Sequence, residues 1–243
     1  MTVACGCRLL EWDTHFFARR IARFAPTPNA APDWPGIATW CRKHAVECLY
    51  FLCPAADPAL ARFAGQHNFQ LVDIRLTLEC QLNTPLPEKS PAQARIRPAC
   101  PADLTALQAI ARTSHRNTRF FRDGTFPAAL CEKFYETWIE INMTDSATTV
   151  WLAEVANQPA GYCAAQRQAD GRGQISLLAV DAAQRQLGLG RQLIQQALTG
   201  FREQGLTMAQ VVTQGGCTGP QRLYQQCGFV TADVGLWYHK WFA

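Results

Sequence analysis

Apolar and polar positions change their spacing several times along the chain, and each change predicts an element. Residues 47–53 ("ECLYFLC") and 69–82 are apolar runs typical of strands, whereas residues 57–68 ("DPALARFAGQHN") repeat apolar positions at helical spacing. Asp57 suits the N-cap of this helix, and Pro58 suits its first turn. The N-terminal part of the chain therefore predicts a small α/β half-domain.

A linker is expected next. Residues 83–95 ("NTPLPEKSPAQAR") concentrate proline with polar and charged residues between two regions of clear apolar periodicity. A cut within this segment predicts two domains, residues 1–90 and residues 91–243.

The second domain is predicted to have the order β-α-α-β-β-β-α-β-α-β. Three consecutive strands, expected at residues 149–155, 161–168 and 174–180, are separated by short turns and predict an antiparallel meander. Residues 115–127 ("HRNTRFFRDGTFP") have no regular period and are expected to be irregular. The fold class is therefore α/β in the broad sense, an α+β arrangement whose mixed, mainly antiparallel sheet is flanked by helices. The expected strands are 94–99, 149–155, 161–168, 174–180, 208–214 and 229–242, and the expected helices are 100–114, 128–142, 188–203 and 220–227.

One pattern occurs twice. Residues 59–79 and 220–240 share a short helix, a residue suited to the left-handed conformation (Asn68 or Gly228), a phenylalanine and a strand. The first domain is therefore either a reduced copy of the second or an example of general α/β recurrence. Where the second copy has Tyr224 the first has Ala64, so chemistry is assigned to the C-terminal domain alone.

Composition narrows the class of protein. The chain has 243 residues, 48% of them hydrophobic, which is enough for a sizeable core. No apolar run approaches the roughly 20 residues that cross a bilayer, and the start of the chain lacks the pattern of a secretory leader. The net charge of +4 comes from scattered arginines, which argues against nucleic acid and for a small anionic ligand. We expect a soluble, cytoplasmic protein.

The cysteines are expected to be reduced. Eleven cysteines with irregular spacing do not suggest a secreted disulfide framework. Cys41, His44, Cys48 and Cys53 lie close together in the sequence, but their gaps match no common zinc module. We expect buried thiols here and no metal.

The stretch 175–198 ("ISLLAVDAAQRQLGLGRQLIQQAL") joins a predicted strand to a predicted helix through glycines. A helix N-terminus presents unpaired backbone N–H groups, and glycine lets a phosphate approach them closely. Arg185 and Arg191 flank Gly188 and Gly190 and can add charge-assisted contacts. The junction indicates a diphosphate site, although glycines at a helix start also serve packing alone.

The motif R-x-x-G-x-G at 185–190, followed by "LYQQCGF" at 223–229, resembles the GNAT superfamily of acetyl-CoA-dependent N-acetyltransferases, over roughly residues 95–242. The resemblance implies an acyltransferase enzyme with acetyl-CoA as cosubstrate. In that family the strand before the loop faces the pantetheine arm, and the loop amides bind the pyrophosphate. By position, the implied cofactor residues are Leu178, Ala179, Val180, Arg185, Gln186, Leu187, Gly188, Leu189, Gly190 and Arg191.

The family's tyrosine corresponds to Tyr224, whose implied role is to donate a proton to the departing thiolate. A phenol with a pKa of about 10 stays protonated at neutral pH and matches a thiolate with a pKa of about 8.5 to 10. Many members have Asn seven residues and Ala four residues before this tyrosine, where this chain has Cys217 and Pro220. Cys217 can still stand beside the pantetheine, but it lacks the hydrogen bonds of an amide.

The general base has no clear candidate in the sequence. The strand at 174–180 has no acid, so we expect a water held by backbone carbonyls, with Glu154 and His115 as weaker candidates. Backbone N–H groups near Ala179 or Val180 are expected to polarise the thioester carbonyl.

The acceptor is expected to be an amino sugar. Within the superfamily, "LEWDTHFF" at 10–17, "SHRNTRFFRD" at 114–123 and "VVTQGG" at 211–216 resemble the TDP-fucosamine acetyltransferases, which acetylate a nucleotide-linked 4-amino-4,6-dideoxyhexose. Arg119 is suited to the diphosphate, Phe120 to stacking, and Asp123 to a hydroxyl or the amine. A solvated basic loop with its phenylalanines in the core is the other interpretation.

Two other functions also fit the sequence: acetylation of a protein N-terminus or another small amine, and a non-catalytic acyl-CoA-binding module. The closing aromatic residues either complete the sheet or form a homodimer contact. These residues are Trp237, Tyr238, Trp241 and Phe242.

Overall fold

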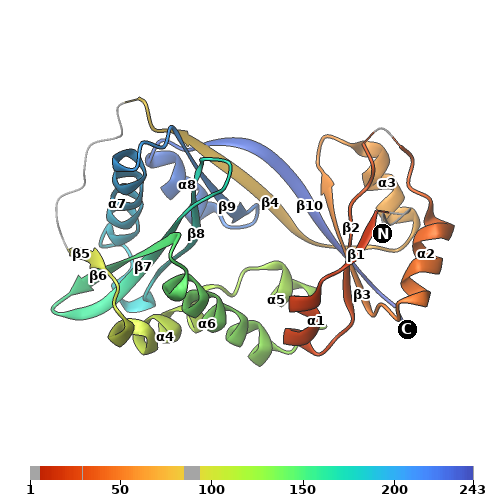
Figure 1. Cartoon of the computed structure of the whole chain (residues 1–243), viewed down its shortest axis with the longest axis horizontal. Helices are drawn as coiled ribbons and strands as arrows, with labels where there is room; N and C mark the ends of the chain where they lie inside the picture. Colours follow the sequence, from red (N-terminus) through yellow and green to blue (C-terminus); the bar gives the residue numbers. More distant parts are fainter. Residues whose placement is uncertain (1–5, 29, 85–93, 243) are drawn as a thin grey trace. The chain divides into compact units, whose positions relative to one another are not determined.

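The computed structural model describes residues 6–28, 30–84 and 94–242, and it divides into two compact units (Figure 1). Unit 1 comprises residues 1–75, 118–130 and 233–243, and unit 2 comprises residues 76–117 and 131–232. Both units are therefore discontinuous in sequence. The predicted domain boundary near residue 90 lies outside the described residues.

Unit 1 contains strands in the order β1-β2-β3-β10, together with the first residues of β4 (Gln70–Gln81). β1 (Cys7–Leu9) pairs antiparallel with β2 (Ile21–Phe24), β2 pairs parallel with β3 (Cys48–Pro54), and β3 pairs antiparallel with residues 235–241 of β10 (Val230–Trp241). The closing aromatic stretch therefore completes this sheet, which was one of the two alternatives for it.

Helices cover both faces of the unit 1 sheet. On one face, α2 (Trp34–Lys43) and α3 (Pro58–Gln66) bury a cluster that includes Phe24, Phe51 and Phe63. Rings from α1 (Glu11–Phe17), α5 (Arg119–Asp123) and the residues after it pack together over Tyr50 on the other face. The prediction that residues 115–127 are irregular is thus wrong for α5, a helix too short to show a period.

Residues 94–242 contain the predicted helices and strands in the predicted order, with α5 as an additional short helix, and most of these elements lie in unit 2. Its strands β5 (Arg95–Pro98), β6 (Thr148–Val155), β7 (Gln158–Arg167) and β8 (Gly173–Val180) are antiparallel neighbours, so the meander is confirmed. β9 (Met208–Gln214) pairs parallel with β8. The later residues of β4 (Gln70–Gln81) lie beside β9.

Two helix layers enclose this sheet (Figure 1). α7 (Leu189–Glu203) and α8 (Thr218–Gln226) cover one face, and α4 (Leu104–Ser114) and α6 (Ala128–Thr144) cover the other. Because α7 carries apolar residues at helical spacing, its buried stripe joins residues of β7 and β8 in the main core cluster. Short 3₁₀ turns, η1 (Pro101–Asp103) and η2 (Ala182–Gln184), precede α4 and the glycine loop.

The repeated pattern is real at the level of the backbone. Asn68 and Gly228 both have positive φ, at 55° and 90°. The amides of Phe69 and Phe229 donate to the carbonyls of Ala64 and Tyr224, at 2.9 and 3.1 Å, respectively. The helix ends of the two copies are therefore built alike, with Ala64 standing where Tyr224 stands. Asp57 also caps α3 as predicted, accepting from the amides of Ala59 and Leu60 at 3.0 Å each.

Gly173 sets the distance between α7 and the start of β8. A Cβ added to Gly173 would lie 2.6 Å from ring atoms of Phe201, which is shorter than any van der Waals contact. We predict that Gly173→Ala lowers the free energy of unfolding by about 2 kcal/mol, because the ring or the strand must shift. Urea unfolding followed by circular dichroism measures this.

Gly219→Ala is the matched control, since no atom lies within 4 Å of a Cβ at that position in α8. Alanine is the better helix former, so this variant is expected to be neutral or slightly stabilising. Equal losses in the two variants would contradict the steric explanation.

Candidate active site

β8 contains one extra residue at the centre of unit 2. Ala164 of β7 pairs with Leu177 and Ala165 pairs with Ile175, which leaves Ser176 as a β-bulge. The pairing between β8 and β9 ends at the same place, since its last partners are Ile175 and Val211. Because a bulge bends its strand and increases the local twist, β8 leaves β9 at Ser176.

The bulge also changes which side chains face which helices. Ile175, Leu178 and Val180 all pack on the α7 side of the sheet. In an unbroken strand, Ile175 and Leu178 would face opposite sides, because they are three residues apart. Ala179 faces the opposite side, where its register partner is Tyr162. The three predicted pantetheine residues, Leu178, Ala179 and Val180, therefore lie just past the point where β8 separates from β9.

A buried asparagine holds the bulge. The Ser176 hydroxyl donates to Oδ1 of Asn142 at 2.7 Å, and Nδ2 of Asn142 donates to the carbonyl of Trp138 at 2.7 Å. Asn142 is buried on the same stripe of α6 as Cys131, Tyr135 and Ile139. The sequence analysis missed this residue, although a polar residue on an apolar helix stripe was a signal for it.

The loop after β8 has the backbone expected of an anion cradle. Gln186 and Gly188 have φ values of 67° and 72°, whereas Leu187 between them does not have positive φ. Such alternation turns successive amides toward one side. Gly188 is the N-cap of α7 without a side-chain cap, and no atom lies within 4 Å of where its Cβ would stand. The N-cap residue therefore contributes no side-chain acceptor to the first amides of α7, and the positive φ of Gly188 favours glycine at this position.

Gly190 has a different role. A Cβ at this position would lie 3.0 Å from Leu223 and 3.9 Å from Val180. Its small size therefore lets α8 and the end of β8 approach the first turn of α7, so this glycine serves packing. Since Leu223 precedes Tyr224, the contact links the glycine loop to the predicted catalytic helix.

Tyr224 is buried in the core cluster of unit 2, and its ring packs against Phe229 at a centroid distance of 5.7 Å. Burial, with smaller contributions from Cys163 and Cys227, raises the pKa of Tyr224. The phenol is therefore neutral at physiological pH and retains a proton to donate.

The other predicted cofactor residues surround this region. Cys217 is the half-buried N-cap of α8, and Gln221 fixes the loop before it by donating to the carbonyls of Gln214 and Gly215. Arg185 donates to the carbonyl of Val180 at 3.3 Å. Burial raises the pKa of the Cys227 thiol to about 11, and the nearby positive charge of Arg191 partly opposes this rise. Leu187 is exposed, whereas Leu189 is buried in the core.

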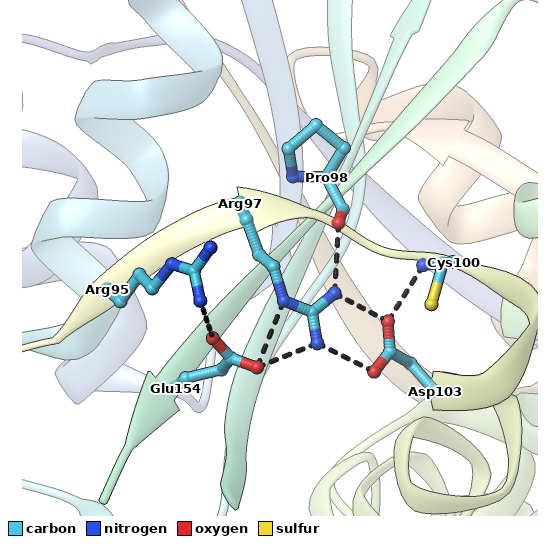
Figure 2. A network of polar contacts seen from close by, with 6 residues as sticks. All are labelled: Arg95, Arg97, Pro98, Cys100, Asp103 and Glu154. Atoms are coloured by element: carbon cyan, nitrogen blue, oxygen red, sulfur yellow. Dashed lines mark hydrogen bonds and ion pairs between the residues drawn. The ribbon is translucent and has the colours of Figure 1, made fainter. Parts of the chain in front are cut away.

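His115 and Glu154, the two weaker candidates for the general base, both contact other side chains. His115 Nε2 lies 3.0 Å from the Tyr162 hydroxyl, its ring stacks on Tyr135, and burial lowers the pKa of His115 to about 4. Figure 2 shows Glu154 bound by Arg97, with Nη2 2.7 Å and Nε 3.0 Å from Oε1. The same guanidinium binds Asp103 through two hydrogen bonds, of 2.7 and 2.8 Å (Figure 2). Glu154 is therefore part of an ionic network that joins β5, β6 and η1.

The three predicted acceptor residues belong to unit 1. Phe120 and Asp123 are buried, with 3% and 6% of their surfaces exposed, and Arg119 is half-buried. Asp123 Oδ2 accepts from Nδ1 of His239, and its carboxylate also accepts from the indole of Trp241 at 3.0 Å. Arg119 lies 3.1 Å from the other ring nitrogen of His239. The helix thus brings these residues together around a buried histidine that sequence reasoning did not identify.

Other classes of site are not found in the described part of the chain. No three His, Cys, Asp or Glu side chains among residues 6–28, 30–84 and 94–242 gather as a metal site, and the thiols of Cys41, Cys48 and Cys53 are buried. No helix in these ranges is long and apolar enough to cross a membrane.

Residues 113–229 match the family model described as "Acetyltransferase (GNAT) family". No curated protein matches the sequence. Among solved structures, a GCN5-related N-acetyltransferase from Sphaerobacter thermophilus is similar with a TM-score of 0.70 and 17% identity, over 97% of this chain and 76% of that one.

Two further solved structures are similar. A GCN5-related N-acetyltransferase from Kribbella flavida has a TM-score of 0.62 and 18% identity, over 91% of this chain and 81% of that one. A tandem GNAT protein from the clavulanic acid biosynthesis pathway has a TM-score of 0.58 and 15% identity, over 91% and 75%. At these identities the likeness establishes the fold, which is the GNAT fold.

The ionic network at Arg97 makes stability depend on pH. Hydrogen bonds from Arg97 hold the pKa of Asp103 well below its usual range, so the carboxylate contributes stability above its unfolded pKa of about 4. This contribution is lost as the pH falls below that value. We predict that Asp103→Asn lowers the free energy of unfolding by about 2 kcal/mol at pH 7, and by progressively less below about pH 4.

Urea unfolding of both proteins between pH 3 and pH 8 measures this difference. Asp170→Asn is the control, because Asp170 also pairs with an arginine, Arg172, but is 49% exposed. An exposed pair contributes little to stability, because water screens the two charges, so Asp170→Asn should change the free energy of unfolding much less than Asp103→Asn does. A pH-independent difference for Asp103→Asn would contradict the assigned charge.

Proposed function

We propose, starting from the GNAT acetyltransferase domain that the comparisons support over residues 113–229, that this enzyme moves an acetyl group from acetyl-CoA to the primary amine of a nucleotide-linked amino sugar. Enzymes of this family generally use acetyl-CoA as cosubstrate. The observation that carries the proposal is the glycine loop, with Gln186 and Gly188 at positive φ, linked through Gly190 and Leu223 to the helix of Tyr224.

The loop and β8 would hold the coenzyme. The amides from Gln186 to Arg191 suit its pyrophosphate, because they lie at the N-terminus of α7, where the N-cap residue Gly188 has no side chain to compete with an anion. Leu178, Ala179 and Val180 offer a strand edge to the pantetheine arm, since pairing with β9 ends at Ile175. Cys217 stands at the start of α8, where many relatives have asparagine, and contributes packing without amide hydrogen bonds.

Tyr224 is assigned as the general acid. The neutral amine of the acceptor forms a bond to the acetyl carbon, the carbon–sulfur bond breaks, and the phenol gives its proton to the departing sulfur. The raised pKa of Tyr224 keeps this proton in place at neutral pH. Backbone N–H groups at Ala179 or Val180 would stabilise the negative charge on the acetyl oxygen.

The amine must lose a proton, and we assign this step to water held by backbone carbonyls. Glu154 is bound by Arg97, and His115 has a pKa of about 4, which makes it a weak base. His115 instead suits a role in ordering such a water through the Tyr162 hydroxyl.

For the acceptor we propose Arg119, Phe120 and Asp123. Arg119 keeps part of its surface exposed and would meet the diphosphate, as guanidinium groups bind phosphate oxygens in pairs. Phe120 and Asp123 would position it, one through its ring and the other through His239. A cytoplasmic location and a homodimer are further parts of the proposal.

Acetyl-CoA consumption with a panel of TDP- and UDP-linked amino sugars tests the acceptor. The panel includes a peptide with a free N-terminus and a polyamine, which represent the second candidate. Turnover of the amino sugars alone supports the proposal, whereas turnover of the peptide alone replaces it. Calorimetry that detects acetyl-CoA binding without turnover of any acceptor would support the non-catalytic acyl-CoA-binding module, and no acetyl-CoA binding at all would contradict the proposal.

We predict that Tyr224→Phe lowers kcat by roughly 100-fold or more while the Kd for acetyl-CoA stays within about twofold, because only the proton donor is removed. Steady-state kinetics and calorimetry measure the two quantities. Tyr238→Phe, which removes a hydroxyl from β10 in unit 1, is the control and should leave both unchanged. Full activity of Tyr224→Phe would exclude the phenol as the acid.

A further inference from the structure

We propose that unit 1 contains a binding site for a multiply charged phosphate anion, formed by Arg8 and Arg23 on one face of its sheet and by Arg119 of α5 packed over the same face, with Arg75 of β4 adding positive charge. The site stands on the geometry of unit 1 alone. It deepens the proposed function only if the bound phosphates belong to the acceptor, and the experiment below separates that case.

A row of register partners crosses the sheet. Arg8 of β1 pairs with Arg23 of β2, Arg23 pairs with Tyr50 of β3, and Tyr50 pairs with His239 of β10. Directly opposed residues project to the same face of a sheet, so Arg8 and Arg23 are neighbours of like charge. Like charges in this position destabilise a sheet unless an anion lies between them.

Two more arginines join this pair. The guanidinium of Arg119 lies 4.3 Å from the ring centroid of Tyr50 and 4.5 Å from that of Trp237, and the guanidinium of Arg23 lies 5.5 Å from the same Trp237 ring. Burial, followed by the charges of Arg8, Arg119 and Arg75, lowers the pKa of Arg23. The positive charges of Arg8, Arg75 and Arg119 therefore all act on the guanidinium of Arg23.

Hydrogen-bond donors here have no acceptor. Nε of Arg23 and the hydroxyl of Tyr50 are both buried and have no partner in the described part of the chain, and Tyr50 is 0% exposed. Arg23 and Tyr50 are register partners, so their two unpaired donors lie on the same face of the sheet. A ligand with several acceptor oxygens could accept hydrogen bonds from both.

The carboxylates of unit 1 do not neutralise the group. Asp13 is half-buried and acts electrostatically on Arg119 and Arg8, and Asp233 acts on Arg75, but neither forms an ion pair with them among the described residues. Asp73 pairs with Arg122 at 3.1 Å, and Asp123 is bound to His239. Four arginines thus face two unpaired carboxylates, which leaves net positive charge for an anion of charge −2 or more.

Phosphate is the chemistry that fits best. Guanidinium groups bind phosphate oxygens through paired hydrogen bonds, and several arginines suit a diphosphate better than a single carboxylate. Both aromatic faces at the site are already covered by arginines, which points to the anionic part of a ligand.

Calorimetry of the full chain with pyrophosphate tests the site, at constant ionic strength set with sodium chloride. We expect saturable binding by the wild type and about tenfold or weaker binding by Arg23→Gln and by Arg8→Gln. Arg62→Gln, at an exposed position of α3, is the matched control and should bind as the wild type does. Arg8 is exposed on a short strand, so its variant carries the test if Arg23→Gln does not fold.

No binding by the wild type, or equal binding by all four proteins, would overturn the site. A second arm identifies the source of the anion by measuring KM for any acceptor that the enzyme turns over. A raised acceptor KM in Arg8→Gln assigns the site to the acceptor's diphosphate, and an unchanged KM with lost pyrophosphate binding assigns it to a separate anion. Because pyrophosphate binding needs no turnover, failure of the proposed function leaves the first arm intact.

Discussion

One extra residue in β8 organises unit 2. The bulge at Ser176 ends the pairing with β9 and reverses the alternation of the following side chains, so that Leu178 and Val180 face α7 while Ala179 faces Tyr162. Asn142 holds the bulge from the opposite helix layer. The separation of β8 from β9 next to the N-terminus of α7 thus follows from one inserted residue, which a single buried amide supports.

The two loop glycines act on this arrangement in different ways. Gly188 adopts a left-handed backbone conformation, with φ of 72°, in open surroundings. Gly190 instead allows α8 to pack closely against α7, since a Cβ at this position would lie about 3 Å from Leu223. The first leaves the start of α7 without a side chain at its N-cap, and the second brings the helix of Tyr224 against the same turn. The motif therefore links, through packing, the loop that we propose for the cofactor to the helix of the proposed acid.

The apolar periods predicted long elements well because each helix and strand buries one face. The N-cap at Asp57, the meander and the left-handed residues Asn68 and Gly228 follow from local chemistry and were predictable. The short helix at 119–123 has too few residues for a period. The partners of Asn142, Arg97 and His239 lie far away in sequence, so contacts that only the folded chain creates decided these sites.

The two copies of the helix–strand pattern differ at the position of the proposed acid. Both end a helix with the same backbone hydrogen bonds, but one carries Tyr224 and the other Ala64, so the first copy lacks the phenol that we propose as the general acid. One face of the unit 1 sheet carries the row of Arg8, Arg23, Tyr50 and His239. Burying a histidine and hydrogen-bond donors that have no acceptor lowers the stability of the fold. Binding of an anion to these groups is a function that would account for this loss. Unit 1 is therefore better understood as an anion-recognition element than as a remnant that only completes a core.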